Sequence, residues 1–116
     1  MQRWQESTEF ALTDALGTTA EIPLAGYAGG LMRFPSTNTA TLLTFYASDI
    51  QTGRPTTGST TGTATFAALK DDSNAAITRT ISAGASTMRL PLECFAAGAI
   101  KIVADAAVTM VLSRKS

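Results

Sequence analysis

Turn-forming residues recur at short intervals along this chain, and their spacing limits what it can fold into. They include Gly29-Gly30, Pro35-Ser36, Asp71-Asp72-Ser73-Asn74, Gly84 and Gly98. The segments between them are short and rich in threonine, whose β-branched side chain favours extended backbone. Short strands separated by regularly spaced turns are typical of a β-sandwich or a barrel. We therefore expect an all-β protein.

The pattern predicts about eight strands in a single β-sandwich of jelly-roll type. The expected strands span residues 20–24, 30–34, 40–47, 63–69, 75–81, 86–90, 98–103 and 107–114. The segment 40–47 has apolar side chains on both faces, which favours a central strand covered on each side and a core position for Tyr46. Tyr27 is expected to pack beside a turn.

The last two strands are expected to form a hairpin across residues 104–106. In this pairing Ile100 and Ile102 would oppose Val108, Met110 and Leu112. Residues 91–95, just before the hairpin, are too few for a helix of ordinary length. We expect them to form one helical turn that closes an end of the sandwich with Leu92 and Phe95.

The N-terminal residues allow more than one interpretation. Residues 6–16 are compatible with an amphipathic helix capped by Ser7, or with a strand or an extended arm. We favour an arm plus edge strand over residues 1–17, followed by the β-sandwich domain over residues 18–116. Trp4 stands in a polar stretch, where it is either an anchor in a partner's pocket or a lid on its own sandwich.

Composition narrows the function classes. The chain has 116 residues, which is the size of one domain. Nine basic and nine acidic residues give no net charge, so no long-range field would gather nucleic acid or an anionic membrane. The chain has no histidine, which removes imidazole-based catalysis and metal binding, and its one cysteine cannot form an intrachain disulfide. We expect no enzyme activity and no cofactor.

The remaining candidates for chemistry favour structural roles. Residues 71–74 (DDSN) offer four oxygen-bearing side chains, but a β-turn is favoured over a calcium site because adjacent turn residues point in different directions. Cys94 lies among apolar neighbours and is expected to be buried and unreactive. The N-terminus lacks the apolar segment of a secretory signal, and no apolar run is long enough to cross a bilayer. We expect a soluble protein made in a cytoplasm.

Contacts with a partner are expected at two places. Residues 51–62 (QTGRPTTGSTTG) form a hydroxyl-rich segment with no apolar side chain, and long loops of this kind are often functional. The N-terminal segment supplies isolated aromatic residues. The predicted interface residues, for a partner protein or for another copy of this chain, are Trp4, Phe10, Arg54, Thr56, Thr57 and Thr60.

Several segments together resemble a known class of proteins. Residues 20–27 (AEIPLAGY) are followed by an apolar strand that ends at Pro35, and residues 42–49 (LLTFYASD) are similar to the Leu-Thr-Phe-x-Ala-Ser strand of small virion proteins of tailed bacteriophages. The similarity continues through residues 88–95 (MRLPLECF), 100–102 (IKI) and 109–112 (TMVL). It covers most of residues 18–113, and the segment 51–62 departs from it.

The resemblance implies a capsid decoration, or cement, protein. Such a protein is made in the host bacterial cytoplasm and binds the outside of an icosahedral head, where it clamps neighbouring copies of the major capsid protein. It is expected to form a homo-oligomer, with a trimer favoured over a dimer. Two alternatives stay open: a carbohydrate-binding module, which requires exposed aromatic residues on one sheet face, and a tail or head-completion protein of the virion.

Overall fold

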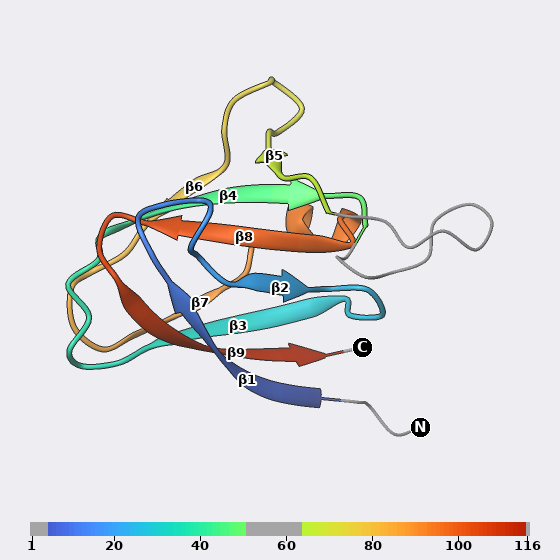
Figure 1. Ribbon diagram of the computed structural model, residues 1–116. Coiled ribbons are helices and arrows are strands. Elements are labelled where there is room, and N and C mark those ends of the chain that lie inside the picture. Colours follow the sequence, from blue (N-terminus) through green and yellow to red (C-terminus); the bar gives the residue numbers. More distant parts are fainter. Residues whose placement is uncertain (1–4, 51–63, 116) are drawn as a thin grey trace.

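The computed structural model describes residues 5–50 and 64–115, and this part of the chain is all-β (Figure 1). It contains nine strands and one 3-10 helix. The strands are β1 (Gln5–Leu12), β2 (Glu21–Pro23), β3 (Gly29–Phe34), β4 (Leu42–Ser48), β5 (Ala67–Ala68), β6 (Thr78–Thr80), β7 (Ser86–Arg89), β8 (Ala99–Ala104) and β9 (Val108–Lys115), and the 3-10 helix η1 spans Leu92–Ala96. The expectation of an all-β protein is confirmed.

The strands form two antiparallel sheets. The first has the order β1-β9-β3-β7, and the second has the order β2-β8-β4-β5, with β6 also pairing with β4. Strands β1, β3, β7 and β9 belong to the first sheet, and those that come between them in the chain belong to the second. The chain therefore crosses repeatedly from one sheet to the other, and most hydrogen-bonded neighbours are distant in sequence.

The expected hairpin between the last two strands is wrong. Strand β8 pairs with β2 and β4, whereas β9 pairs with β1 and β3, so the turn around Asp105 carries the chain from one sheet to the other. The alternating apolar residues do face inward, and Ile102 and Met110 are fully buried. They belong to opposite walls of the core. The alternation of apolar and polar residues determines which face of a strand is buried. The same alternation occurs in the two strands of a hairpin and in two strands of facing sheets, so it does not show which strands pair.

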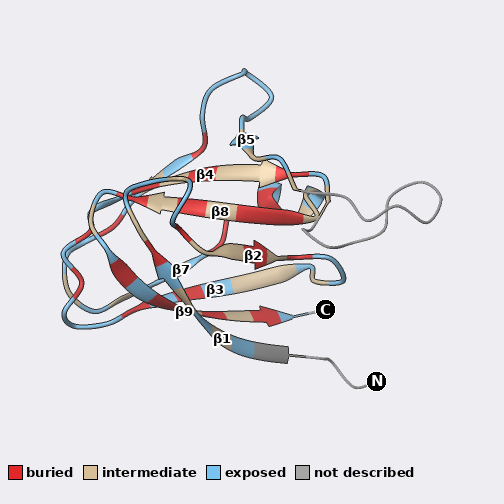
Figure 2. Cartoon of the chain, in the orientation of Figure 1, coloured by how far each residue is buried: buried red, intermediate tan, exposed pale blue. Residues whose placement is uncertain are grey.

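The core lies between the two sheets, and the loops carry most of the exposed residues (Figure 2). Its largest fully buried side chains are Leu12, Ile22, Leu24, Met32, Phe34, Leu43, Phe45, Leu90, Ile100, Ile102, Met110 and Leu112. These residues come from both sheets and from the segments that join them. Burial of this apolar area is the main stabilising contribution to a fold of this size.

Strand β4 is fully covered on one face and only partly covered on the other, which corrects the prediction of a core position for Tyr46. Leu43 and Phe45 are fully buried, but Leu42 is 43% exposed and Tyr46 is only half-buried. Because directly opposite residues share a face, Tyr46 lies on the outer side with its neighbours Lys101 and Ala68. The segments that carry Leu16 and Phe66 reach Lys101 on this side, through a hydrogen bond from its Nζ to the Leu16 carbonyl oxygen (3.1 Å) and a contact with the Phe66 ring (5.1 Å).

The helical turn after β7 is present, but its inward residues differ from the prediction. Leu92 is 62% exposed, which corrects its expected role as a plug, whereas Cys94 is fully buried and Phe95 is half-buried against the core. A 3-10 turn has three residues per turn, and here the buried position falls on Cys94. No helix in the described residues has the length and apolar character needed to span a membrane.

Candidate binding surface

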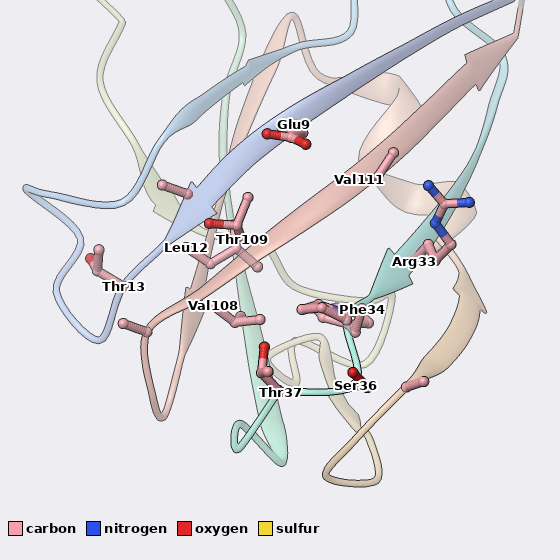
Figure 3. A pocket seen from close by; sticks show the side chains of 14 residues that line it. Glu9, Leu12, Thr13, Arg33, Phe34, Ser36, Thr37, Val108, Thr109 and Val111 are labelled. Atoms are coloured by element: carbon pink, nitrogen blue, oxygen red, sulfur yellow. The ribbon is translucent and has the colours of Figure 1, made fainter.

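An open groove lies on the outer side of the first sheet, over strands β1, β9 and β3 (Figure 3). Its volume is about 730 Å³. Fourteen residues line it: Glu9, Ala11, Leu12, Thr13, Arg33, Phe34, Pro35, Ser36, Thr37, Ala85, Ala107, Val108, Thr109 and Val111. The groove thus combines an apolar floor with hydroxyl groups and two opposite charges.

The two charges stand on either side of the floor. Val111 in β9 lies opposite Glu9 of β1 and opposite Arg33 of β3, so the three residues form one row across three strands. Neighbouring strands are about 4.8 Å apart, which separates the Glu9 and Arg33 backbones by about 10 Å. No ion pair joins these two described side chains, and both are exposed. Each charge is therefore available to a ligand that spans the groove.

Strand alternation explains this arrangement. In β9 the inward positions Val108, Met110, Leu112 and Arg114 are all buried, while Thr109, Val111 and Ser113 point outward. Threonine, valine and serine have short side chains, so the outward residues of β9 extend only a little above the sheet. The longer side chains of Glu9 and Arg33 flank it and form its polar walls.

A buried guanidinium fixes the position of β1 beside the groove. Arg114 is 3% exposed, and its Nη1 donates a hydrogen bond to the carbonyl oxygen of Pro23 (2.6 Å) while Nη2 donates to Oγ1 of Thr8 (3.2 Å). The guanidinium carbon also lies 5.4 Å from the centre of the Phe10 ring and 4.6 Å from that of Tyr27. Such cation–π contacts strengthen when the cation is desolvated. Arg114 therefore connects β1 to β2 and to the turn that carries Tyr27.

The outer edge of β1 presents backbone groups. The backbone N–H of Ala20 donates to the carbonyl oxygen of Ala11 (3.0 Å), so the polar groups of Ala11 point away from β9. In an antiparallel pair alternate residues point their N–H and C=O groups to the same side, and those of Glu9 and Ser7 therefore also point away from β9. No strand in the described part of the chain pairs with this side of β1.

The turn at Asp71 and the thiol of Cys94, the two other candidates for chemistry, both have structural roles. The Asp71 carboxylate accepts hydrogen bonds from the backbone N–H groups of Ser73 (2.9 Å) and Ala75 (3.0 Å), which confirms the predicted turn. Burial is the main cause that raises the pKa of the Cys94 thiol to about 12, with a further contribution from the Glu93 carboxylate. Within the described ranges, no group of three or more His, Cys, Asp and Glu side chains is placed to hold a metal ion.

The predicted interface residues fall into two groups. Phe10 is half-buried, packs against the core and lies under Arg114, while its strand borders the groove. Trp4, Arg54, Thr56, Thr57 and Thr60 lie outside the described residues. The edge strand proposed for the N-terminal segment is present as β1, paired with β9 over eight residues, and the helical alternative is wrong.

Sequence reasoning missed the groove residues Glu9, Val111 and Arg33. The signal available was that each occupies an outward position of a strand. What the sequence lacked was the pairing of β1 and β3 with the same partner strand, because 78 positions separate Arg33 from Val111 in the chain. Comparison with known protein families, curated proteins and solved structures found no match to this chain.

Proposed function

We propose that this chain is a non-enzymatic structural protein of a bacteriophage virion. In this proposal it is a capsid cement protein that binds the outer surface of the head and stabilises contacts between copies of the major capsid protein. The observation that carries the proposal is the groove on the first sheet, because its apolar floor between Glu9 and Arg33 suits an extended segment of another protein. The resemblance described above supplies the identity of that partner.

The jelly-roll form of the sandwich belongs to the same proposal. A jelly roll has two sheets built from two Greek keys, so that successive strands alternate between the sheets. The strand orders β1-β9-β3-β7 and β2-β8-β4-β5 support this assignment, with β6 as an addition beside β5. Strand β4 and the two short strands that follow it share one sheet, as a single hairpin of a jelly roll would.

A cement role requires firm attachment from a small neutral module. We infer a homo-oligomer, with a trimer favoured over a dimer by the symmetry of capsid axes. Several weak groove contacts would then add through effective concentration. The proposal includes no cofactor, no direct contact with nucleic acid and no membrane partner, and it places the protein on the capsid after synthesis in the host cytoplasm.

A second candidate function has an observation in its favour. Tyr46 and Phe66 are half-buried, and Tyr46 lies on the outer side of the second sheet beside Lys101. The Nζ atom of Lys101 lies 5.1 Å from the centre of the Phe66 ring. Aromatic rings on one sheet face are what a carbohydrate-binding module needs, so a sugar-binding role for a virion protein is the alternative. A tail or head-completion role would use the same groove as the cement role.

The experiment is co-sedimentation with phage heads that lack this protein, using the full chain. We expect the chain to pellet with the heads, and we expect Arg33→Glu to lose most of this binding because it reverses one of the two groove charges. The matched control is Arg89→Glu, because Arg89 is also an exposed arginine on the first sheet but does not line the groove. Equal binding by both variants and the original chain would contradict the groove as the capsid contact.

A second experiment distinguishes the carbohydrate-binding alternative from the cement role. A glycan array probed with the original chain and with Tyr46→Ala tests the aromatic side of the second sheet. Sugar binding that Tyr46→Ala removes, together with no binding to heads, would transfer the assignment to a carbohydrate-binding module. Binding to isolated tails in place of heads would support the tail or head-completion role.

A further inference from the structure

The edges of the two sheets differ in how well they are protected against pairing with another chain. Exposed strands with free backbone groups pair readily with other strands, and proteins usually limit this with short strands, prolines, charged side chains (lysine above all) or a covering loop. Edge strand β2 has three residues and includes Pro23, β5 has two, β6 has three, and β7 has four and is followed by Pro91. Strand β1 has eight residues and contains neither proline nor lysine. Its charges are the glutamates at positions 6 and 9, and its outer edge is covered by another described segment only at Ala11, which accepts the hydrogen bond from Ala20.

The free backbone groups of β1 are suitably placed for a symmetric partner. Those of Ser7 and Glu9 point away from β9, as shown above from the hydrogen bond between Ala20 and Ala11. A second β1 strand running antiparallel across a two-fold axis would present the same two residues in reverse order. Such an interface is self-complementary, which is the property that a closed dimer requires.

Charge disfavours one register of this pairing and favours another. If Glu9 faced Glu9 of the second copy, two carboxylates would lie directly opposite, which is unfavourable. If Ser7 faces Glu9 of the second copy, each hydroxyl lies opposite a carboxylate, and both pairs are formed twice by symmetry. Thr8 then lies on the two-fold axis, opposite its own copy.

We propose that two copies of this chain dimerise through β1, with Ser7 of each copy paired to Glu9 of the other. The first sheet then continues across the axis as one eight-stranded sheet in the order β7-β3-β9-β1-β1-β9-β3-β7. Because Glu9 also forms a wall of the groove, the two grooves lie on the same side of this sheet and flank the axis. The dimer would thus present two binding grooves together.

The proposal goes beyond the cement role and changes its expected stoichiometry. A two-fold pairing occupies β1 of both copies, so it gives a dimer instead of the trimer expected from capsid symmetry. Light scattering and sedimentation equilibrium on the purified full chain measure this directly. We expect a mass of twice 12.1 kDa that falls to the monomer mass on dilution. A monomer at all concentrations, or a trimer, would overturn the proposal.

Variants at Ser7 test the register. Ser7 is exposed, and both Ser7→Lys and Ser7→Glu lose the same hydrogen bond between its hydroxyl and that of Ser113 (2.8 Å). Ser7→Lys places an ammonium opposite Glu9 of the other copy and tightens the dimer, whereas Ser7→Glu places two carboxylates opposite each other and weakens it. We expect the dimer Kd values of the two variants to differ by about tenfold or more.

The control variants are Thr87→Lys and Thr87→Glu. Thr87 is exposed on the same side of the first sheet, but it belongs to β7 at the opposite edge, so both changes should leave the dimer Kd unchanged. Equal weakening by Ser7→Lys and Ser7→Glu would overturn the register, because it is the result expected when Ser7 faces its own copy. Circular dichroism of each variant verifies that the sandwich is folded.

Binding to phage heads separates this proposal from the proposed function. A chain that is monomeric in solution but still pellets with heads overturns the β1 pairing and leaves the cement role in place. A dimer with the expected response to the Ser7 variants but no affinity for heads supports the pairing and counts against the cement role.

Discussion

Asp105 and Thr41 are joined by two hydrogen bonds that connect the turn between the sheets to the start of β4. The backbone N–H of Thr41 donates to Oδ1 of Asp105 (2.8 Å), and the Thr41 hydroxyl donates to Oδ2 (2.8 Å). The backbone N–H of Leu42 also donates to Oδ1 (3.2 Å). These bonds fix the segment in which the chain passes from β8 to β9. Their donors hold the pKa of the Asp105 carboxyl below its ordinary value.

The first prediction concerns the pH dependence of this contact. Because the folded state lowers the pKa of Asp105, its contribution to stability is complete above the ordinary aspartate pKa of about 3.9 and is lost as the pH falls toward the lower folded value. We expect Asp105→Ala to unfold at a lower temperature than the original chain at pH 7. The difference between their melting temperatures should become smaller below about pH 4. Asp14→Ala, at another exposed aspartate, is the control and should melt like the original chain.

The second prediction concerns the buried Arg114. Replacement by alanine removes the hydrogen bonds to Pro23 and Thr8 and the contacts with two aromatic rings. We expect Arg114→Ala to lower the free energy of unfolding by about 3 kcal/mol in urea titrations. Arg114→Lys keeps the charge but cannot donate to both partners from one planar group, so it should also be destabilising. A loss below about 1 kcal/mol for both variants would show that β1 is held by other contacts.

Arg114 also shows what the sequence could and could not predict. Alternation in the last strand placed position 114 on the inward face, and that position is buried. The sequence around Arg114 does not indicate its hydrogen-bond partners, Pro23 and Thr8, because they lie 91 and 106 positions earlier in the chain. The face of each strand followed from local alternation. The contacts that explain a buried charge depend on strand order across both sheets.

The groove also shows that local alternation predicts which face a residue occupies but not which strands are neighbours. Glu9 and Arg33 were recognisable as outward residues of two strands, but nothing local placed both beside Val111. The incorrect hairpin between β8 and β9 made this harder, because it assigned β9 a neighbour from the other sheet. Apolar residues alternate with a period of two both in a hairpin and in strands of facing sheets, so the alternation alone could not distinguish them. The actual neighbours of β9 are β1 and β3, which are far away in the sequence.

The third prediction concerns Cys94. With its pKa raised to about 12, the buried thiol should be unreactive toward iodoacetamide at pH 8, and labelling in urea should follow the unfolding transition. A raised folded pKa also means that stability is unaffected below the ordinary thiol pKa of about 8.5 and decreases as the pH rises above it, by up to about 1.4 kcal/mol per pH unit. Cys94→Ala should lack this decrease. Rapid labelling of the folded chain would contradict the prediction.

The fourth prediction concerns Gly98, which lies where three strands of the second sheet meet. Its N–H donates to the carbonyl oxygen of Ser48 (3.0 Å), and its own carbonyl oxygen accepts a hydrogen bond from the N–H of Leu24 (3.0 Å). A Cβ atom at this position would lie 2.6 Å from the carbonyl oxygen of Asp49 and 3.0 Å from the Cα of Ile50. Backbone atoms cannot move away as a flexible side chain can.

We therefore expect Gly98→Ala to lower the free energy of unfolding by about 2–3 kcal/mol, because the strand ends must separate to admit one methyl group. Gly17→Ala is the matched control, since no atom lies within 4 Å of the Cβ position there and the change should stay within about 0.5 kcal/mol. Urea titration of both variants measures the difference. Equal stability of the two variants would mean that the approach of Gly98 to Asp49 is not required for the second sheet to form.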